Sequence, residues 1–251
     1  MLLETKNLLI SLAEKYETED FIHSDPISFP HRYRKKEDVE IAAMIASWLA
    51  YGKRELFLRV LDDLSKDFND SPFGFIRQQK YKKYQYDNTC LYRFYKKKDY
   101  YLLCQRLYNI YFGDEQETNM QMKLSKLLNT NKTDDCILVL QKLIYLFDSV
   151  VGIPQNTLSA CKRLCMFLRW MVRKDSPVDF GIWDIIDAQN LIIPVDVHVF
   201  RQSSLLRLTS RHSVDMKTAI EITEHLKEVF PNDPLKADFA LFGYGVNNQK
   251  N

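Results

Sequence analysis

Turn-forming residues are scarce in this chain, which has seven glycines and eight prolines among its 251 residues. A many-stranded sheet needs numerous tight turns and bulges, and these two residue types build most of them. Apolar residues instead recur at helical spacing, for example at Ile41, Met44, Ile45, Trp48 and Leu49. The sequence therefore predicts an all-α fold.

The same periodicity predicts helices over 2–16, 37–64 with a break at Gly52, 122–128, 136–147, 159–172, 197–208 and 216–230, and a short closing helix. The run LIIPVDV, Leu191–Val197, is rich in β-branched residues. Pro194 interrupts it, and no second run of this kind exists to pair with it. We expect this run to be an extended connector.

Bulk composition is that of a folded protein, with 46% hydrophobic and 27% charged residues. The net charge of +2 does not by itself indicate a nucleic-acid binder, so the positions of the charges must decide. Acidic residues occur within the first residues of the chain, unlike in a signal peptide. No uncharged apolar run approaches the roughly 18 residues that a membrane span needs. We expect a cytoplasmic protein with no membrane partner.

The five cysteines lie at positions 90, 104, 136, 161 and 165, and none forms a CxxC pair. Metal-binding and redox cysteines usually come in such pairs. We therefore expect buried, reduced thiols in a reducing compartment, and no metal site.

The expected helix over 159–172 carries an apolar stripe and a cationic stripe. Lys162, Arg169 and Arg173 share the cationic one, at spacings of seven and four residues. Such a stripe is either a solvated basic face or a row of phosphate contacts. Lys162 lies near the helix N-terminus, where backbone N–H groups also attract anions.

Asp196 precedes the expected helix over 197–208 and is well placed to cap it. This segment alone is compatible with a structural cap or a functional carboxylate. His198 and Arg201 follow within the helix. Farther upstream, tyrosines alternate with lysines and arginines over 77–106, which suits either DNA backbone binding with base stacking or an amphipathic surface.

Several motifs together carry a resemblance to a known superfamily. The segment IPVDVHVFR resembles the PVDTHVxR signature of the helix-hairpin-helix DNA glycosylases, which include endonuclease III and the 8-oxoguanine glycosylases. SACKR resembles the start of the second helix of their hairpin, DPLKADFALFGYG their closing helix, and EIAAMIASWLAYGKRELFLRVLDDL their early helix pair. DPISFPHRYRKKEDVE and FLRWMVRKD look most like an uncharacterised bacterial branch known by a domain-of-unknown-function label.

The resemblance implies two helical subdomains with a cleft between them, within one unit spanning 1–251. Residues 38–175 would form a helical barrel with the hairpin, and 1–37 plus 178–251 the second subdomain. It implies a base-excision glycosylase, with or without AP-lyase activity, acting on damaged double-stranded DNA, for example on 8-oxoguanine. The matching catalytic residues are Lys162 and Asp196. The expected DNA contacts are Arg163, Arg169, Arg173, His198 and Arg201, and the expected base-pocket aromatics are Trp48 and Trp170.

Three features depart from the superfamily pattern. The usual hairpin LPGVGxxTA has glycines, whereas IPQNTLSACKR has none. Lys162 and Asp196 are 34 positions apart (196 − 162), longer than in the endonuclease III type and closer to the archaeal 8-oxoguanine type. The four-cysteine loop is absent, so no iron–sulfur cluster and no other cofactor is expected. The hairpin favours a non-catalytic nucleic-acid-binding module, whereas the Lys162–Asp196 pair favours the enzyme. A helical protein-interaction domain is a third alternative.

Overall fold

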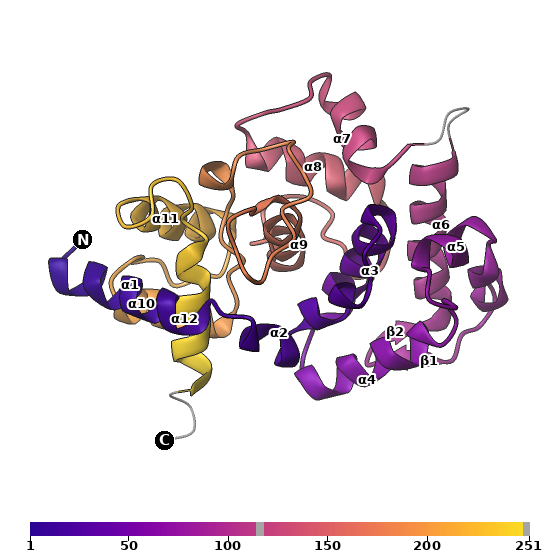
Figure 1. Cartoon of the computed structure of the whole chain (residues 1–251), viewed down its shortest axis with the longest axis horizontal. Coiled ribbons are helices and arrows are strands. Elements are labelled where there is room, and N and C mark those ends of the chain that lie inside the picture. Colours follow the sequence, from indigo (N-terminus) through magenta and orange to yellow (C-terminus); the bar gives the residue numbers. More distant parts are fainter. Residues whose placement is uncertain (114–117, 248–251) are drawn as a thin grey trace. The chain divides into compact units, whose positions relative to one another are not determined.

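The computed structural model describes residues 1–113 and 118–247, and this part of the chain is mostly helical, as the sequence predicts (Figure 1). Contacts divide the chain into two compact units. The first unit comprises Met1–His23, Lys132–Leu140 and the residues from Asn156 onwards, and the second comprises Ser24–Asn131 and Gln141–Gln155.

The main helices of the first unit are α1 (Leu3–Tyr16), α9 (Lys162–Val172), α10 (Val197–Leu205), α11 (Met216–Lys227) and α12 (Lys236–Asn247), with the 3-10 turn η4 (Ala188–Asn190). The second unit holds η1 (Pro26–Ser28), η2 (Pro30–Arg32), α3 (Lys36–Leu49), α4 (Arg54–Ser65), α5 (Pro72–Arg77), η3 (Lys80–Tyr84), β1 (Cys90–Tyr92), β2 (Tyr95–Lys96), α6 (Lys97–Phe112) and α7 (Met120–Leu128). Two helices cross the unit boundaries, α2 (Asp20–Ser24) and α8 (Cys136–Leu146).

These units differ from the subdomains expected from the sequence. The structure places α9 in the same unit as α10, α11 and α12, whereas 38–175 was expected to hold it, and it places 24–37 in the other unit. The physical reason is that ion pairs in the interior of the first unit hold α9 there. Arg169 pairs with Asp238 on α12, and Arg173 pairs with Glu17 just after α1 and with Asp233 just before α12. These ion pairs tie α9 to those segments.

The first unit is built around α12, which packs against α1 and α10 (Figure 1). The α1–α12 contact depends on Gly243. A Cβ atom added there would lie 2.5 Å from Cγ of Tyr16, closer than packed carbon atoms approach. From Leu164 to Val172, every residue of α9 is buried, so this helix lies inside its unit.

The second unit is built around α3, whose residues from Asp38 to Leu49 are all buried. An almost uniformly apolar helix of this kind belongs in a core. One of its two buried carboxylates, Glu40, accepts a 2.5 Å hydrogen bond from the hydroxyl of Tyr111. Trp48 packs on Tyr95 and Tyr100, so aromatic side chains fill the core beside the end of the helix.

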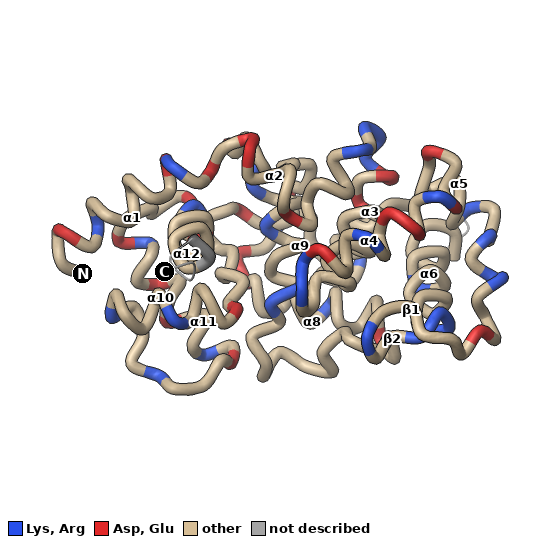
Figure 2. The backbone as a smooth tube through the Cα atoms, turned by 90° about the horizontal axis from the view of Figure 1, so that it is seen from below, with Lys and Arg blue, Asp and Glu red and all other residues tan. Residues whose placement is uncertain are grey.

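The sequence-based elements are largely confirmed, including the extended connector before α10. Among the described residues, strands β1 and β2 form an antiparallel hairpin that the sequence did not predict, because each strand has at most three residues. Basic and acidic residues are interspersed along the backbone, consistent with the small net charge (Figure 2). No described helix is long and apolar enough to cross a membrane.

Candidate active site

Asp196 caps α10, as predicted. Its backbone is extended, and its Oδ1 accepts hydrogen bonds of 2.9 Å from the backbone N–H groups of His198 and Val199. The preceding connector is buried, with Ile193 fully and Val195 almost fully enclosed. The backbone of Asp196 is therefore fixed on both sides, by the buried connector before it and by α10 after it. One carboxylate oxygen, Oδ1, is occupied by the hydrogen bonds that cap the helix.

Lys162 is the first residue of α9. The residue before it, Cys161, has a left-handed backbone with φ of +46°, a conformation that non-glycine residues rarely adopt. Leu158, on the turn leading to it, accepts a hydrogen bond from the backbone N–H of Met216 at the start of α11. The turn thus holds the start of α9 in place without the glycines of the usual hairpin.

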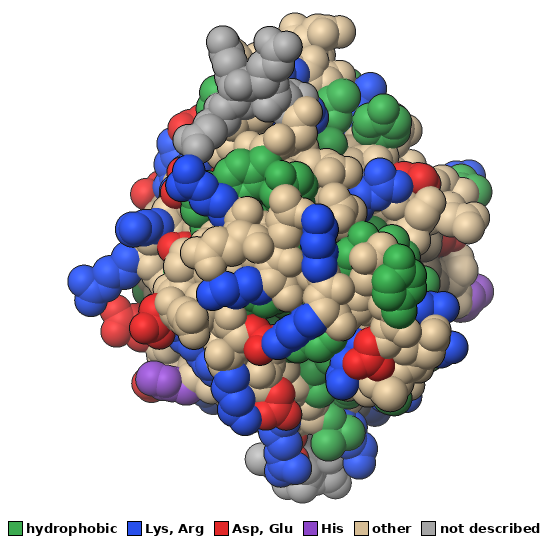
Figure 3. Space-filling view, turned by 90° about the vertical axis from the view of Figure 1, so that its right-hand side faces the viewer, with side chains coloured by type: hydrophobic (Ala, Val, Ile, Leu, Met, Phe, Trp, Pro, Cys, Tyr) green, Lys and Arg blue, Asp and Glu red, His purple; other side chains and the backbone are tan. Residues whose placement is uncertain are grey.

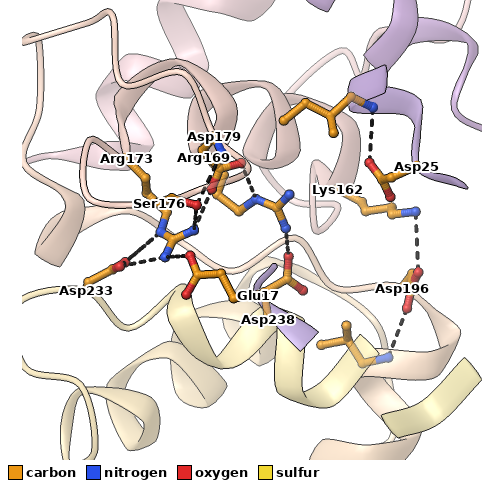
Figure 4. A network of polar contacts seen from close by, with 12 residues as sticks. Glu17, Asp25, Lys162, Arg169, Arg173, Ser176, Asp179, Asp196, Asp233 and Asp238 are labelled. Atoms are coloured by element: carbon orange, nitrogen blue, oxygen red, sulfur yellow. Dashed lines mark hydrogen bonds and ion pairs between the residues drawn. The ribbon is translucent and has the colours of Figure 1, made fainter. Parts of the chain in front are cut away.

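The side chains of Lys162 and Asp196 meet (Figure 4). The distance from Nζ of Lys162 to the second carboxylate oxygen of Asp196, Oδ2, is 3.4 Å. The lysine side chain is 34% exposed and the aspartate side chain 14%. Both residues belong to the first unit and lie 34 positions apart (196 − 162), and their catalytic roles remain predictions. The pair presents a partly accessible amine beside a fixed carboxylate.

A second carboxylate, Asp238 on α12, lies in the field of this pair. It is buried and bound to Nη1 of Arg169. The pKa of Asp238 is raised to about 6: burial raises it most, the Arg169 guanidinium lowers it in part, and the negative charge of Asp196 also raises it. A role for Asp238 was not predicted from the sequence. A signal existed, because one acidic residue interrupts the apolar run ADFALFG.

Arg169 and Arg173 do not form the phosphate-binding stripe predicted from the sequence. Their side chains are only 4% and 1% exposed. Arg169 contacts Asp179 and Asp238, whereas Arg173 binds three carboxylates (Figure 4). The three partners of Arg173 are Glu17, Asp179 and Asp233. The prediction is wrong for both arginines, because acidic partners on other segments, not solvent, face this side of α9.

The two base-pocket tryptophans are also incorrectly predicted. Trp48 is 1% exposed in the second unit and donates a 2.7 Å hydrogen bond to the carbonyl of Val151. Trp170 is fully buried in the first unit, and its indole N–H has no hydrogen-bond partner among the described residues. Neither ring offers a face to a ligand, since helical periodicity marks core positions and does not distinguish them from pocket walls.

The other predicted DNA contacts lie nearer the surface. Arg163 is half-buried in the first turn of α9, and Arg201 is exposed on α10. The ring of His198 lies edge-on to Phe242, with centroids 5.9 Å apart, and its Nδ1 is buried with no hydrogen-bond partner among the described residues. DNA contact remains a prediction for these three residues.

Most tyrosines of the segment 77–106 are buried. Tyr81, Tyr95 and Tyr100 are fully buried, and Tyr92 is 5% exposed. Tyr86 and Phe94 are exceptions, at 84% and 53% exposure. On the side of α5 and α6, Lys and Arg side chains lie among exposed hydrophobic ones (Figure 3). The segment is therefore an amphipathic layer with few aromatic rings available for stacking.

Four of the five cysteines are buried, as predicted, but Cys90 is exposed on β1. Burial raises the pKa values of Cys104 and Cys165, which makes their thiolates unfavourable. Within 1–113 and 118–247, no group of three or more His, Cys, Asp or Glu residues is arranged to hold a metal ion.

The fold and site thus define a class of mostly helical proteins with a lysine–aspartate pair at adjoining helix starts. The chain belongs to the family described as protein of unknown function (DUF2400), whose model matches residues 25–247. That range includes both Lys162 and Asp196. No curated protein and no solved structure gives a significant match.

Proposed function

We propose that this protein is a DNA base-excision glycosylase with AP-lyase activity, acting on a damaged base such as 8-oxoguanine in double-stranded DNA. The observation that carries the proposal is the contact of Lys162 with Asp196, 3.4 Å apart. The resemblance of IPVDVHVFR and SACKR to the helix-hairpin-helix glycosylases assigns catalytic roles to the same two residues.

The chemistry requires a nucleophile and a nearby anion. Breaking the bond between the base and C1′ of deoxyribose develops positive charge on the sugar, and a fixed carboxylate stabilises that charge. The neutral amine of Lys162 forms a bond to C1′ as the base leaves with the bonding electrons and takes up a proton. Opening of the sugar ring then gives a Schiff base, from which elimination of the 3′ phosphate cuts the strand.

The geometry of Asp196 supports this role. One carboxylate oxygen is held by two backbone N–H groups and the other faces Lys162, so the group needs no rearrangement before charge develops. Lys162 is only partly exposed, which leaves its amine accessible to a ligand while the carboxylate is sheltered.

A non-catalytic nucleic-acid-binding module is the second candidate. It is favoured by the turn over 153–161, which lacks glycines that would let the backbone approach a phosphate, and by the burial of Arg169 and Arg173. A helical protein-interaction domain is the alternative if no nucleic acid binds.

The test is a panel of duplexes, each carrying one damaged base, with release of the free base and strand cleavage measured separately. We expect both on at least one lesion, with both lost in Asp196→Asn and strand cleavage lost in Lys162→Gln. DNA binding without base release on any lesion would support the non-catalytic module. Absence of binding at low salt would leave the protein-interaction domain.

A further inference from the structure

Two exposed aromatic rings and an arginine meet in the second unit, where α3 ends. Tyr51 is 45% exposed and Phe94 53%, and their ring centroids lie 5.4 Å apart in an edge-to-face arrangement. The guanidinium carbon of Arg93 lies 4.9 Å from the centroid of the Tyr51 ring. Large aromatic side chains are more often enclosed, so an exposed pair beside a cation is a candidate for binding.

The hairpin of β1 and β2 holds this cluster in a fixed position. The hydroxyl of Tyr92 donates a 2.5 Å hydrogen bond to the carbonyl of Tyr51. The ring of Phe94 packs on the buried ring of Tyr95, with the two centroids 4.4 Å apart. Because Tyr92 and Tyr95 pair across the hairpin, the turn residues Arg93 and Phe94 are presented together. A preformed arrangement loses little conformational entropy when it binds.

Gly52 makes the approach of Arg93 possible. Its φ of +85° lies in the left-handed region, and a Cβ atom added there would fall 2.1 Å from Nη1 of Arg93. Any side chain at this position would push the arginine away from Tyr51. The glycine after α3 therefore leaves the space that the arginine of the hairpin occupies, although the two residues are about 40 positions apart in the sequence.

The sequence that directly flanks the cluster is basic. Lys53 and Lys96 are exposed and lie two positions from Tyr51 and Phe94, respectively. Neither 48–54 nor 90–96 contains an acidic residue. Aromatic faces beside cations suit nucleic acid, since bases stack on the rings and phosphates attract the lysines.

We propose that Tyr51, Arg93 and Phe94 form a binding site for an unpaired nucleobase of DNA, with Lys53 and Lys96 contacting the adjoining phosphates. This inference rests on the proposed function in requiring that the protein bind DNA. It adds a binding site in the second unit to the catalytic pair in the first.

The test compares fluorescein-labelled duplexes that are fully paired with duplexes containing a short single-stranded gap. Wild type should bind the gapped duplex more tightly. The double variant Tyr51→Ala, Phe94→Leu should bind it at least tenfold more weakly, because base–aromatic stacking is lost. A 2-aminopurine in the gap should be quenched by wild type and not by the variant.

Two controls separate stacking from loss of fold. Tyr145→Ala removes another exposed tyrosine, at 66% exposure on α8, and should leave affinity unchanged. Tyr51→Phe keeps the ring and should bind like wild type. Equal affinity of wild type and a folded double variant for the gapped duplex would overturn this inference while leaving the proposed function standing. Failure of wild type to bind any DNA would overturn both.

Discussion

The carboxylate of Asp196 is both a helix cap and the proposed catalytic anion, and one substitution separates these tasks. Asp196→Asn keeps an oxygen that accepts the N–H groups of His198 and Val199. Asparagine caps helices about as well as aspartate, so the free energy of unfolding should change by less than about 1 kcal/mol. Base release should be lost, because the developing charge has no counterion. Urea denaturation and a base-release assay measure the two effects.

Asp196→Ala is the matched comparison, since it removes charge and cap together. It should cost a further ~1 kcal/mol of stability while being no less active than the Asn variant. A fully active Asp196→Asn protein would contradict the assigned role, whatever its stability.

Asp238 predicts a pH dependence of stability. Its pKa is raised from 3.8 in the unfolded chain to about 6 in the folded protein. A raised carboxyl pKa contributes stability that is fully present below pH 3.8 and is lost as pH rises through about 6. The unfolding free energy of wild type minus that of Asp238→Asn should therefore fall by up to about 3 kcal/mol from pH 4 to 7. Chemical denaturation across this range measures it, and a rising difference would be inconsistent with a raised pKa of the buried Asp238 carboxyl group.

Individual residues were predictable where sequence pattern and local chemistry coincide. Asp196 stands immediately before a periodic apolar run, so its capping position followed from local order. Arg169 and Arg173 were misplaced because helical spacing gives the face of a side chain and not what covers that face. Two partners of Arg173, Glu17 and Asp233, are 156 and 60 positions from it in sequence, beyond any local pattern.

At the level of the helices, ion pairs inside the first unit join α9 to the surrounding segments. Arg173→Met would leave Glu17, Asp179 and Asp233 close together without their shared cation. Removing one partner of a buried pair is strongly destabilising, so we expect a loss of about 3–5 kcal/mol by denaturant unfolding. The exposed Arg201→Met is the control and should change stability by less than about 0.5 kcal/mol. Equal effects of the two substitutions would refute the structural role of the buried arginine.

Two glycines of α12 make a matched test of its packing against α1. Ala at position 243 would place Cβ 2.5 Å from Tyr16, whereas Ala at position 245 would meet its nearest neighbour, Cβ of His198, at 3.2 Å. Alanine gains about 1 kcal/mol over glycine within a helix, but overpacking costs about 1–3 kcal/mol. Gly243→Ala should therefore have a lower melting temperature than Gly245→Ala. The reverse order would mean that α1 and α12 do not pack as described.

Most of the long helices were predictable from sequence because each repeats its apolar pattern over several turns, but the 16-residue helix α6 was not predicted, since its tyrosines and lysines obscure that pattern. The β1–β2 hairpin was not, since two or three residues are too few to show alternation. The unit boundaries also escaped prediction, because they follow contacts between distant segments such as α1 and α12.

For the protein as a unit, the small net charge and the interspersed basic and acidic residues along the backbone (Figure 2) predict a moderate electrostatic contribution to the proposed DNA binding. The logarithm of the association constant should fall linearly with the logarithm of salt concentration. If Arg201 contacts a phosphate, Arg201→Ala should reduce the magnitude of the slope by about one. Lys227→Ala, which removes a cation already paired with Glu224, should not alter it. An unchanged slope in the Arg201 variant would remove this residue from the DNA interface.

The central claim is that Lys162 attacks the sugar, and locating the covalent bond tests it most directly. Borohydride reduces a Schiff base to a stable secondary amine, so wild type incubated with a processed lesion duplex should become cross-linked to DNA. Peptide mass mapping should then place the DNA remnant on Lys162, and Lys162→Gln should show no cross-link while remaining folded. A cross-link mapped to any other amine, or one formed equally well by Lys162→Gln, would contradict the claim.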